Sequence, residues 1–495
     1  MNSHTNGVFR ASVAGKCTSS CVGGIGRLLR RAPPVGGMTD DHALYAVSPL
    51  DGRYSGRTDA LAPYVSEAAL MRARVEVEAE YVLALADLDA VPLELVGDER
   101  TALRDAYKTF DAADADLVKR IETEGALGHA ATNHDVKAVE YFLREHAPAR
   151  AHSWIHFGLT SEDVNNLAYR LLVDGAITAV LTPELRGLRD DLVSFAHDYA
   201  DLPMLARTHG QPATPTTFGK EMAVYAARLG RALARITDAV DGLTGKLAGA
   251  SGTWAAHTAA FPDVDWRSFA ARFVDSLGLA YAEPTTQVNP CDDLTAVFDA
   301  VAGANGVLED LAVDAWLYVS QRYLGQDAAD GETGSSTMPH KVNPIDFENA
   351  EGNLAKANSD LGFLGDSLTT SRLQRDLSDS TVKRNIGAAF AHCLLAYRKL
   401  GDGLDAVTPN EAVLREDLRA NPEVIGEAVQ TILRREGHDD AYERVKALTR
   451  GERVSLDDFK ELFASLDIDA DTRDELLALT PERYVGVAAD IARDA

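Results

Sequence analysis

The stretch FGKEMAVYAARLGRALARITDAVDGL, residues 218–243, decides the fold. From Phe218 and Met222 to Val240 and Leu243, large apolar side chains recur at gaps of three and four residues. This spacing places them on one face of a helix for about seven turns. Such a helix is about 40 Å long. We therefore expect a long amphipathic helix that buries one face against other helices.

Similar apolar periods extend on both sides of this stretch. We predict long helices over 161–195, with a kink at Pro183, and over 294–311, and shorter ones over 349–368 and 382–400. Alternating strand patterns are scarce, and the sequence has no glycine fingerprint for a dinucleotide or a phosphate. Several long helices in succession are typical of a bundle. The sequence therefore predicts an all-α fold with a central long-helix bundle.

Composition disfavours several classes of protein. Hydrophobic residues make up 46% of the chain and charged residues 25%, which is ordinary for a globular protein. No charge-free apolar run reaches about 18 residues, so we expect no transmembrane helix. The formal net charge of −27 disfavours a nucleic-acid-binding protein, which needs a basic surface. Because only about a dozen residues are Lys, the acidity favours adaptation to high salt, with general solubility as the alternative.

Residues 1–37 differ from the rest of the chain. They contain arginines and many Gly and Ser residues, with almost no acidic residue. We expect a disordered N-terminal extension, or an upstream start codon with the true start at Met38; a cleaved targeting peptide is the alternative. Cys17 and Cys21 could form half of a metal site, but no second Cys/His pair lies near them. We therefore predict no essential metal and no cofactor.

A polar, glycine-containing loop over 331–344 has the composition of a lid that closes over a substrate. It offers the hydroxyls of Ser335 and Ser336, the cation of Lys341 and the amide of Asn343. Together these groups can take a proton and stabilise a developing oxyanion. A solvated linker is the alternative interpretation.

Two histidines lie in polar links between predicted helices. His209 stands in RTHGQP, residues 207–212, just before a predicted helix, and His134 follows Asn133. An imidazole titrates near neutral pH, so each can give or take a proton. A structural role is the alternative for both.

A cationic patch stands out in this acidic chain. Arg372, Arg375, Lys383 and Arg384 lie within a short segment that also carries hydroxyl side chains. Guanidinium and hydroxyl groups match the oxygens of phosphates and carboxylates, which favours an anion site. Surface ion pairs with the aspartates of the same segment are the alternative.

Taken together, these segments resemble the signatures of the fumarase/aspartase superfamily, and within it those of the bacterial type of the adenylosuccinate lyase family. The matching segments are SPLDGRY at 48–54, TNHDVK at 132–137, TSED at 160–163, RTHGQPATP at 207–215, GSSTMPHKVNP at 334–344, IDFEN at 345–349 and QRDLSDST at 374–381. The resemblance runs from about Tyr45 to the C-terminus. Residues 1–37 have no counterpart in it.

The resemblance implies an architecture and a reaction. It implies a fumarase/aspartase-like, all-α subunit of three domains: an N-terminal helical domain over 38–150, the central long-helix bundle over 151–404 and a C-terminal helical domain over 405–495. It also implies a cytoplasmic homotetramer in which each active site combines residues of three subunits. The implied enzyme is a carbon–nitrogen lyase of purine biosynthesis. Its substrates would be adenylosuccinate, cleaved to AMP and fumarate, and the succinyl-carboxamide ribotide SAICAR, cleaved to AICAR and fumarate.

The resemblance also implies residue roles for a β-elimination. Ser335 aligns with the catalytic base and His209 with the general acid. Glu348 aligns with the carboxylate that pairs with this histidine, and Lys341 and Asn343 align with the groups that stabilise the charged intermediate. Positions aligned with substrate contacts are Arg53, Tyr54, Asn133, His134, Asp135, Thr160, Ser161, Gln287, Ser336, Lys341, Val342, Asn343, Asn349, Arg375, Ser380, Thr381, Val382, Lys383 and Arg384. Of these, His134 would also support catalysis.

Two alternatives remain open. A sibling lyase would release fumarate from another compound, such as argininosuccinate, but His340 and the continuation over 345–349 favour adenylosuccinate. An inactive structural homologue would be expected to lack Ser335, His209 or Lys341, and all three are present.

Overall fold

The structure is a computed structural model that describes residues 42–326, 338, 341–449 and 454–495. The chain forms two compact units, residues 1–53 and 54–495, and each is described by itself. In the first unit, helix α1 covers His42–Tyr45. A Cβ atom at Gly52 would lie 2.5 Å from the carbonyl oxygen of Ala43, so the backbone passes too closely here for a larger residue. The predicted extension over 1–37, with Cys17 and Cys21, lies outside the described residues.

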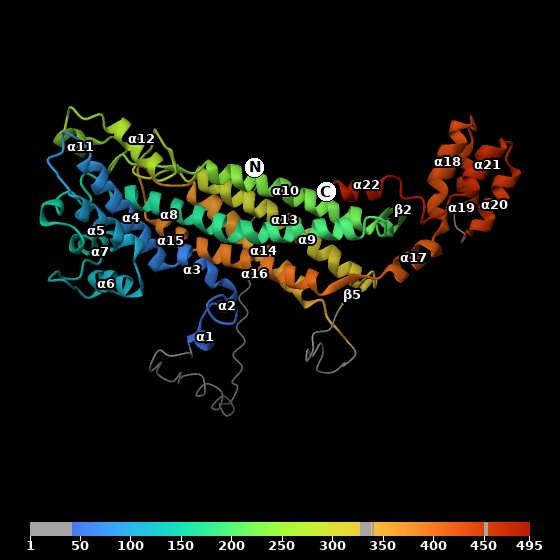
Figure 1. Cartoon of the computed structure of the whole chain (residues 1–495), viewed down its shortest axis with the longest axis horizontal. Helices are drawn as coiled ribbons and strands as arrows, with labels where there is room; N and C mark the ends of the chain where they lie inside the picture. The colour runs from blue at the N-terminus through green and yellow to red at the C-terminus, as the bar shows by residue number, and fades with distance from the viewer. Residues whose placement is uncertain (1–41, 327–337, 339–340, 450–453) are drawn as a thin grey trace, which may run out of the picture. The chain divides into compact units, whose positions relative to one another are not determined.

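The second unit begins with a group of helices around α4. The helix α4 starts after Ser66, whose side chain accepts a hydrogen bond from the backbone N–H of Ala69. It packs against α5, α7 and α8 (Figure 1). The bounds in this group are α2 Ser55–Thr58, η1 Asp59–Leu61, α3 Ala62–Val65, α4 Glu67–Ala86, α5 Gly97–Lys108, α6 Ala112–Thr123, α7 Asp135–Glu145 and η2 Ala149–Ala151.

Long helices follow and form a bundle. In Figure 1, α9, α10, α13, α14 and α16 run side by side, with α10 packed on α9 and α13, α13 on α14, and α14 on α16. The bounds are α8 Ser161–Ala176, η3 Ile177–Leu181, α9 Thr182–Asp198, α10 Phe218–Asp241, α11 Ala255–Ala260, α12 Trp266–Ser276, α13 Asp292–Ser320, α14 Ile345–Leu368, α15 Ser378–Lys383 and α16 Ile386–Asp405. The prediction of an all-α fold built on long helices is confirmed.

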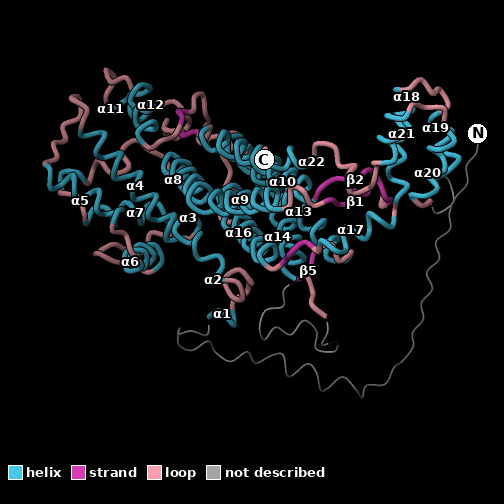
Figure 2. The backbone as a smooth tube through the Cα atoms, turned by 45° about the vertical axis from the view of Figure 1, so that its right-hand side comes forward, coloured by secondary structure: helices cyan, strands magenta, loops and turns pink. Residues whose placement is uncertain are grey.

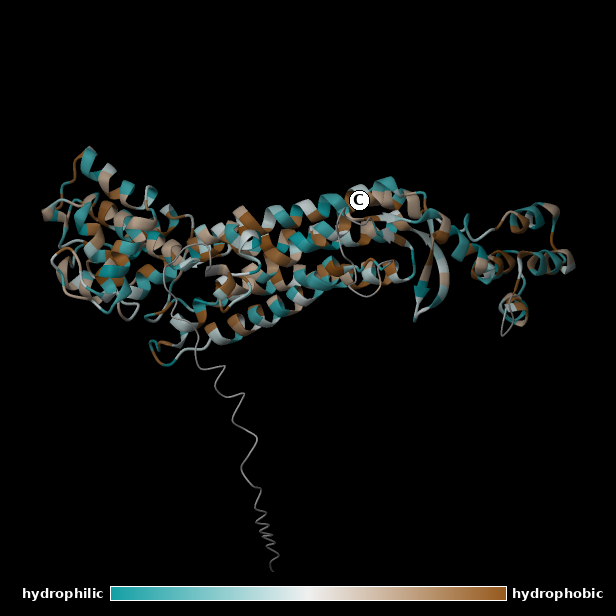
Figure 3. Cartoon of the chain, turned by 90° about the horizontal axis from the view of Figure 1, so that it is seen from below, coloured by the Kyte–Doolittle hydropathy of each residue, from teal (hydrophilic) through white to brown (hydrophobic). Residues whose placement is uncertain are grey.

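The apolar stripe of α10 occupies the bundle core as its period predicts. Phe218, Met222, Leu229, Ile236 and Val240 are all buried. Figure 3, which colours the cartoon by hydropathy, shows hydrophobic and hydrophilic residues interspersed along the bundle helices. Burial of the α10 stripe supplies the main driving force for helix packing, because it removes apolar surface from water.

The helix predicted over 161–195 is interrupted next to Pro183. A π-helical turn, η3, covers Ile177–Leu181, and α9 begins at Thr182 with Pro183 in its first turn. A proline donates no N–H to the preceding turn, so the local change to a π-helical turn is consistent with the hydrogen bond that is missing at Pro183. Thus α8, η3 and α9 follow one another without a loop from residue 161 to residue 198.

Strands are few and short in the described part of the chain. Figure 2 shows them in magenta. They form three two-stranded pairs: β1 Pro203–Thr208 antiparallel to β2 Gln211–Thr217, β3 Thr244–Gly245 parallel to β4 Ala280–Tyr281, and β5 Leu324–Gln326 antiparallel to β6 Val407–Pro409. None of them forms a layer of its own, so the helices carry the fold.

The last helices run from α17 to α22, and of these α18, α19, α20 and α21 enclose a separate apolar cluster, whereas α22 packs against α10. Their bounds are α17 Glu411–Ala420, η4 Pro422–Ile425, α18 Gly426–Arg435, α19 Ala441–Thr449, α20 Leu456–Ser465, α21 Ala470–Leu477 and α22 Ala488–Arg493. Val429, Leu433, Phe459 and Phe463 are buried in this cluster. The domain bounds at 150 and 404 stay predictions.

The described residues contain neither a membrane-spanning helix nor a cluster of metal ligands. No helix among them is long and apolar enough to cross a bilayer. Within the same residues, no group of three or more His, Cys, Asp and Glu side chains is arranged to hold a metal ion.

Candidate active site

A cavity of about 350 Å³ lies where α7, α8 and α15 begin. Eight of the predicted site residues line it: Asn133, His134, Asp135, Ser161, Arg375, Ser380, Lys383 and Arg384. They come from three segments of the chain. The first and the last of these segments are more than 200 residues apart in the sequence. The structure therefore brings three of the predicted motifs together in one chain.

Helix starts position the polar groups of this cavity. His134 is the N-cap of α7, and its Nδ1 accepts a hydrogen bond from the backbone N–H of Lys137 at 3.2 Å. Because Nδ1 is an acceptor, Nε2 carries the proton of the neutral ring. Thr160 is the N-cap of α8, so Ser161 is the first residue of that helix. Both segments thus present side chains at the end of a rigid element.

Asp135 is held as a carboxylate by neighbouring arginines. Arg74, which is buried, donates from Nη2 to Asp135 Oδ2 at 2.9 Å and from Nε to Asn165 Oδ1 at 2.8 Å. Arg384 Nη2 lies 3.3 Å from the same Asp135 oxygen. Burial alone would raise the pKa of Asp135, but the charge of Arg74, with smaller contributions from the Val136 N–H and Arg384, lowers it below the ordinary value.

The cationic patch divides into an exposed part and a buried part. Arg372 is exposed and forms the surface ion pair with Asp376, at 3.1 Å, that the alternative interpretation expects. Lys383 is only 2% exposed, and its Nζ lies 2.8 Å from Glu162 Oε1 and 2.9 Å from Asp379 Oδ2. Burial opposes the charge on Lys383, but Glu162, together with Asp379, outweighs it and raises the pKa of the amine. The charge of Lys383 is therefore balanced inside the protein.

Arg375 is the cation of this patch best placed to meet a ligand. Its Nη2 donates to Ser380 Oγ at 3.2 Å and lies 3.4 Å from Glu162 Oε2. Its Nε is buried and has no hydrogen-bond partner among the described residues. A buried donor without a partner is costly, so this atom favours an anionic ligand in the cavity.

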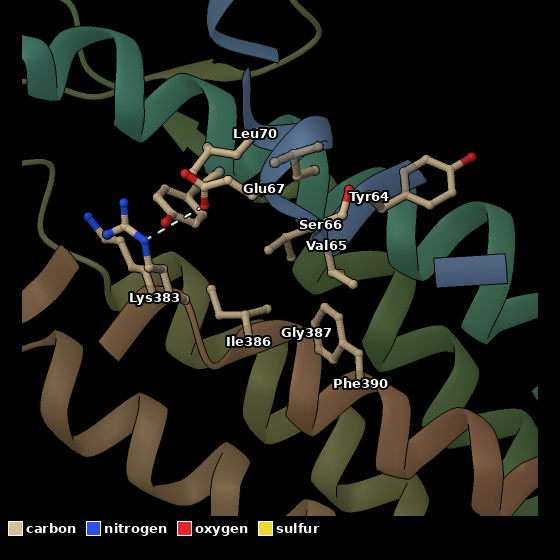
Figure 4. Close-up of a pocket in the computed structure, with 13 residues that line it drawn as sticks. Tyr64, Val65, Ser66, Glu67, Leu70, Lys383, Ile386, Gly387 and Phe390 are labelled. Atoms are coloured by element: carbon tan, nitrogen blue, oxygen red, sulfur yellow. Dashed lines mark ion pairs between the residues drawn. The ribbon is translucent and has the colours of Figure 1, made fainter. Parts of the chain in front are cut away.

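A second cavity, of about 260 Å³, adjoins the first. Figure 4 shows that its lining is mostly apolar, with Val65, Ile386 and Phe390 facing it. The dashed line marks the ion pair between Glu67 and Arg384. Tyr169, Lys383 and Arg384 line both cavities and form the wall between them. Lys383 and Arg384 thus separate the polar first cavity from the mostly apolar second cavity.

His209 lies elsewhere, at the tip of the β1–β2 hairpin. The sequence predicted it just before a helix, but α10 begins only at Phe218 and the intervening residues form β2. His209 and Gly210 have φ values of +52° and +74°, as in a two-residue hairpin turn. Arg207 Nη2 lies 2.6 Å from Asp417 Oδ2 of α17, which anchors the hairpin, and the His209 side chain is exposed.

The predicted residues around the start of α14 form a third group. Lys341 and Val342 are exposed, and Asn343 precedes the helix. Asn349 Nδ2 donates to Tyr54 Oη at 3.4 Å, so these two predicted contacts do lie together. The predicted site residues Ser335 and Ser336 lie outside the described part of the chain.

Three further predictions have separate outcomes. Glu348 was expected to pair with His209, but in the described chain its Oε1 accepts a hydrogen bond from Trp316 Nε1 at 3.1 Å. Gln287 donates from Nε2 to the carbonyl oxygen of Ala250 at 3.0 Å and does not line the first cavity. Arg53 is the last residue of the first unit, so its position is described only within that unit.

Helix length separates the three groups within one chain. The run α8–η3–α9 spans residues 161–198, so Ser161 and the hairpin that carries His209 are about 55 Å apart along it. The helix α14 separates Asn343 from the segment of Arg375 by about 36 Å in the same way. A single chain therefore does not close a site around all the predicted residues.

Sequence reasoning missed three charged residues of the first cavity: Arg74, Glu122 and Glu162. Arg74 lies in α4 between the buried residues Ala73 and Val75, and Glu162 is buried at the start of α8. Both are charged side chains within apolar helical faces, and such groups are rarely buried without a partner. A charged residue within an apolar helical face could therefore have indicated Arg74 and Glu162 from the sequence.

The described cysteines are predicted to be unreactive in the folded protein. Cys291 and Cys393 are both buried, and burial raises the pKa of Cys393 to about 11. Because the thiolate is the reactive form, neither should react with DTNB at pH 8 in a Cys17→Ser/Cys21→Ser variant. Both should react once guanidinium unfolds the chain. Fast labelling of either thiol in the native protein would contradict the burial.

Two family models match the chain. The model described as lyase matches residues 52–358, and the model described as adenylosuccinate lyase C-terminal matches residues 371–485.

Similar curated proteins include three named adenylosuccinate lyase. The protein of Legionella pneumophila (strain Corby) is 43% identical over 458 residues, covering 91% of this chain and 98% of its own length. That of Dictyostelium discoideum is 44% identical over 462 residues, covering 90% and 97%. That of Escherichia coli (strain K12) is 42% identical over 457 residues, with the same two coverages.

Two solved structures share the fold. A fumarate lyase from Mesorhizobium sp. BNC1 superposes with a TM-score of 0.69 at 20% identity, covering 88% of this chain and 97% of that one. A 3-carboxy-cis,cis-muconate lactonizing enzyme from Pseudomonas putida gives a TM-score of 0.69 at 22% identity, covering 92% and 97%. At these identities the likeness concerns the fold alone.

Proposed function

This chain belongs to the adenylosuccinate lyase family, and from this premise we propose that it cleaves adenylosuccinate to AMP and fumarate, and SAICAR to AICAR and fumarate, as an enzyme of purine biosynthesis. One observation carries the proposal. Three motifs predicted to contact this substrate converge on one cavity, in a chain that is 42–44% identical to three curated adenylosuccinate lyases along about nine-tenths of its length.

The proposed reaction is a β-elimination with a base and an acid. Ser335 Oγ, as an alkoxide, takes a proton from the carbon next to a carboxylate of the succinyl arm. The electron pair of that C–H bond forms the C=C bond of fumarate as the C–N bond breaks. His209 gives a proton to the departing nitrogen. Lys341 and Asn343 stabilise the charge that gathers on the carboxylate before the C–N bond breaks.

The cavity suits an anionic substrate even though the whole protein is acidic. Four cations, Arg74, Arg375, Lys383 and Arg384, line it together with three carboxylates, Glu122, Asp135 and Glu162, and Lys383 is buried between Glu162 and Asp379. The unpartnered Nε of Arg375 is the donor that we assign to a substrate oxygen. Because guanidinium groups hold carboxylates and phosphates in fixed geometry, this arrangement supports binding of the substrate's anionic groups.

We assign the complete site to a homotetramer. Ser161 lies about 55 Å from the His209 hairpin along its own helices, so neighbouring chains have to supply the missing groups. The long helices also expose apolar side chains, including Val224, Val313, Trp316, Leu317 and Phe363. Exposed apolar residues on bundle helices are typical of subunit interfaces.

We also propose a cytoplasmic enzyme adapted to high salt. The formal net charge of −27 supports this proposal, because salt screens the repulsion among acidic side chains. Activity and stability should then both rise as salt is added.

The test is an ultraviolet assay of adenylosuccinate cleavage by the full chain across a range of salt concentrations. We expect cleavage, with a maximum at high salt. Absence of cleavage at every salt concentration, with release of fumarate from another compound such as argininosuccinate, would replace this proposal by a sibling activity.

A further inference from the structure

A buried carboxylate in α8 joins two segments that carry predicted substrate contacts. Asp163 is completely buried. Its Oδ2 accepts hydrogen bonds from the backbone N–H of Thr160 at 2.9 Å and of Gly249 at 3.1 Å. Its Oδ1 accepts from the N–H of Ala248 at 2.9 Å. One side chain thus fastens the start of α8 to the loop around residue 249.

Lys246 completes this junction from the other side. It is also fully buried, and its Nζ lies 2.7 Å from Asp163 Oδ1 and donates to the carbonyl oxygen of Gly249 at 2.7 Å. The Lys246 backbone N–H donates to Asn166 Oδ1 at 2.8 Å, and Asn166 Nδ2 donates back to the Lys246 carbonyl at 2.9 Å. The loop therefore has several directional bonds to α8.

The same loop holds Gln287. Ala250, next to Gly249, accepts the hydrogen bond from Gln287 Nε2. A Cβ at Gly252 would lie 2.2 Å from the carbonyl oxygen of Thr285, so the loop and the segment of Gln287 are in close backbone contact. Movement of the loop would therefore move Gln287 relative to Thr160 and Ser161.

We propose that Asp163 and Lys246 are positioning residues that set the spacing between the Thr160–Ser161 segment and Gln287. This inference rests on the proposed function, which gives those residues their role as substrate contacts. Two charges buried at this depth carry a large desolvation penalty, and replacing such a pair by neutral residues is often neutral for stability. The pair is consistent with a role in geometry, because its oxygens fix backbone groups on both segments.

The test compares kinetics and backbone protection in an Asp163→Asn/Lys246→Met variant. Both charges are removed together, so no unpaired charge remains buried. We expect KM for adenylosuccinate to rise at least about tenfold, because displaced contacts weaken binding. The pH profile of kcat should stay as in the wild type, because the proton-transfer groups are untouched. Hydrogen exchange over 158–161 and 284–288 should become faster.

A matched control separates positioning from stability. Asn305 is also fully buried, and it accepts a hydrogen bond from Tyr397 Oη at 2.6 Å within the bundle. Asn305→Ala should lower the thermal midpoint and leave KM within about twofold of wild type, since it touches neither segment. A double variant that behaves like this control, with unchanged KM and unchanged exchange, would overturn the proposal.

A second variant covers the case in which the double variant does not fold, and hydrogen exchange covers the case in which the proposed function is wrong. If the double variant does not fold, Lys246→Arg serves, because it keeps a positive charge opposite Asp163 and changes the geometry of the pair. The same rise in KM and in exchange is expected, and its absence counts against the proposal. If the wild type fails to cleave adenylosuccinate, the proposed function is wrong, while the exchange comparison still decides whether Asp163 and Lys246 fix the two segments.

Discussion

Replacing Ser335 with alanine is expected to lower kcat for adenylosuccinate cleavage by about 1,000-fold, within the range that general acid–base catalysis contributes. The proton that leaves the succinyl arm is bound to carbon and is weakly acidic, so its removal needs a strong base. Alanine has no group that can accept it. Substrate affinity should change little, because the cavity residues that hold the anionic groups remain. Steady-state kcat and KM for adenylosuccinate measure the two effects separately.

The neighbouring hydroxyl gives the matched control. Ser336→Ala should mainly raise KM, because the resemblance assigns Ser336 to substrate contact and not to proton transfer. If Ser335→Ala keeps wild-type kcat while Ser336→Ala loses it, the base has been assigned to the wrong serine. Full activity in both variants would remove the loop from the chemistry altogether.

The long helices could be predicted because their signal is local. The stripe from Phe218 to Val240 needs only the 3.6-residue period and an apolar partner, and the structure buries it as expected. The hairpin that carries His209 was missed because β2 reads QPATPTT, whose two prolines suggest a link. Its pairing with β1 is a tertiary contact that no period in the sequence announces.

The site was predictable as a set of residues but not as a geometry. The motifs identified Asn133–Asp135, Ser161 and Arg375, which the structure places around one cavity. They did not indicate that Lys383 would be buried between Glu162 and Asp379. The pairing of Lys383 with Glu162 depends on how α8 packs relative to α15. Helix packing of this kind is determined by contacts over the whole unit.

Two inactive variants are expected to restore activity when they share a tetramer. His209→Ala should lower kcat by about 1,000-fold, because the departing nitrogen loses its proton donor. Yet if His209 and Ser335 of one site come from different subunits, a mixed tetramer of His209→Ala and Ser335→Ala chains contains sites with both groups intact. Random assembly of equal amounts gives about a quarter of such sites.

The measurement uses co-expression of the two variants with different tags and purification of tetramers that carry both. Activity should reach about a quarter of the wild-type value per site, against about a thousandth for either parent. Mixing His209→Ala with the His209→Ala/Ser335→Ala double variant is the control, since no site in that mixture holds an intact histidine. If mixed tetramers form and stay inactive, both groups come from one chain. Ser161 would still have to come from another subunit, because about 55 Å of helix separates it from the hairpin of its own chain.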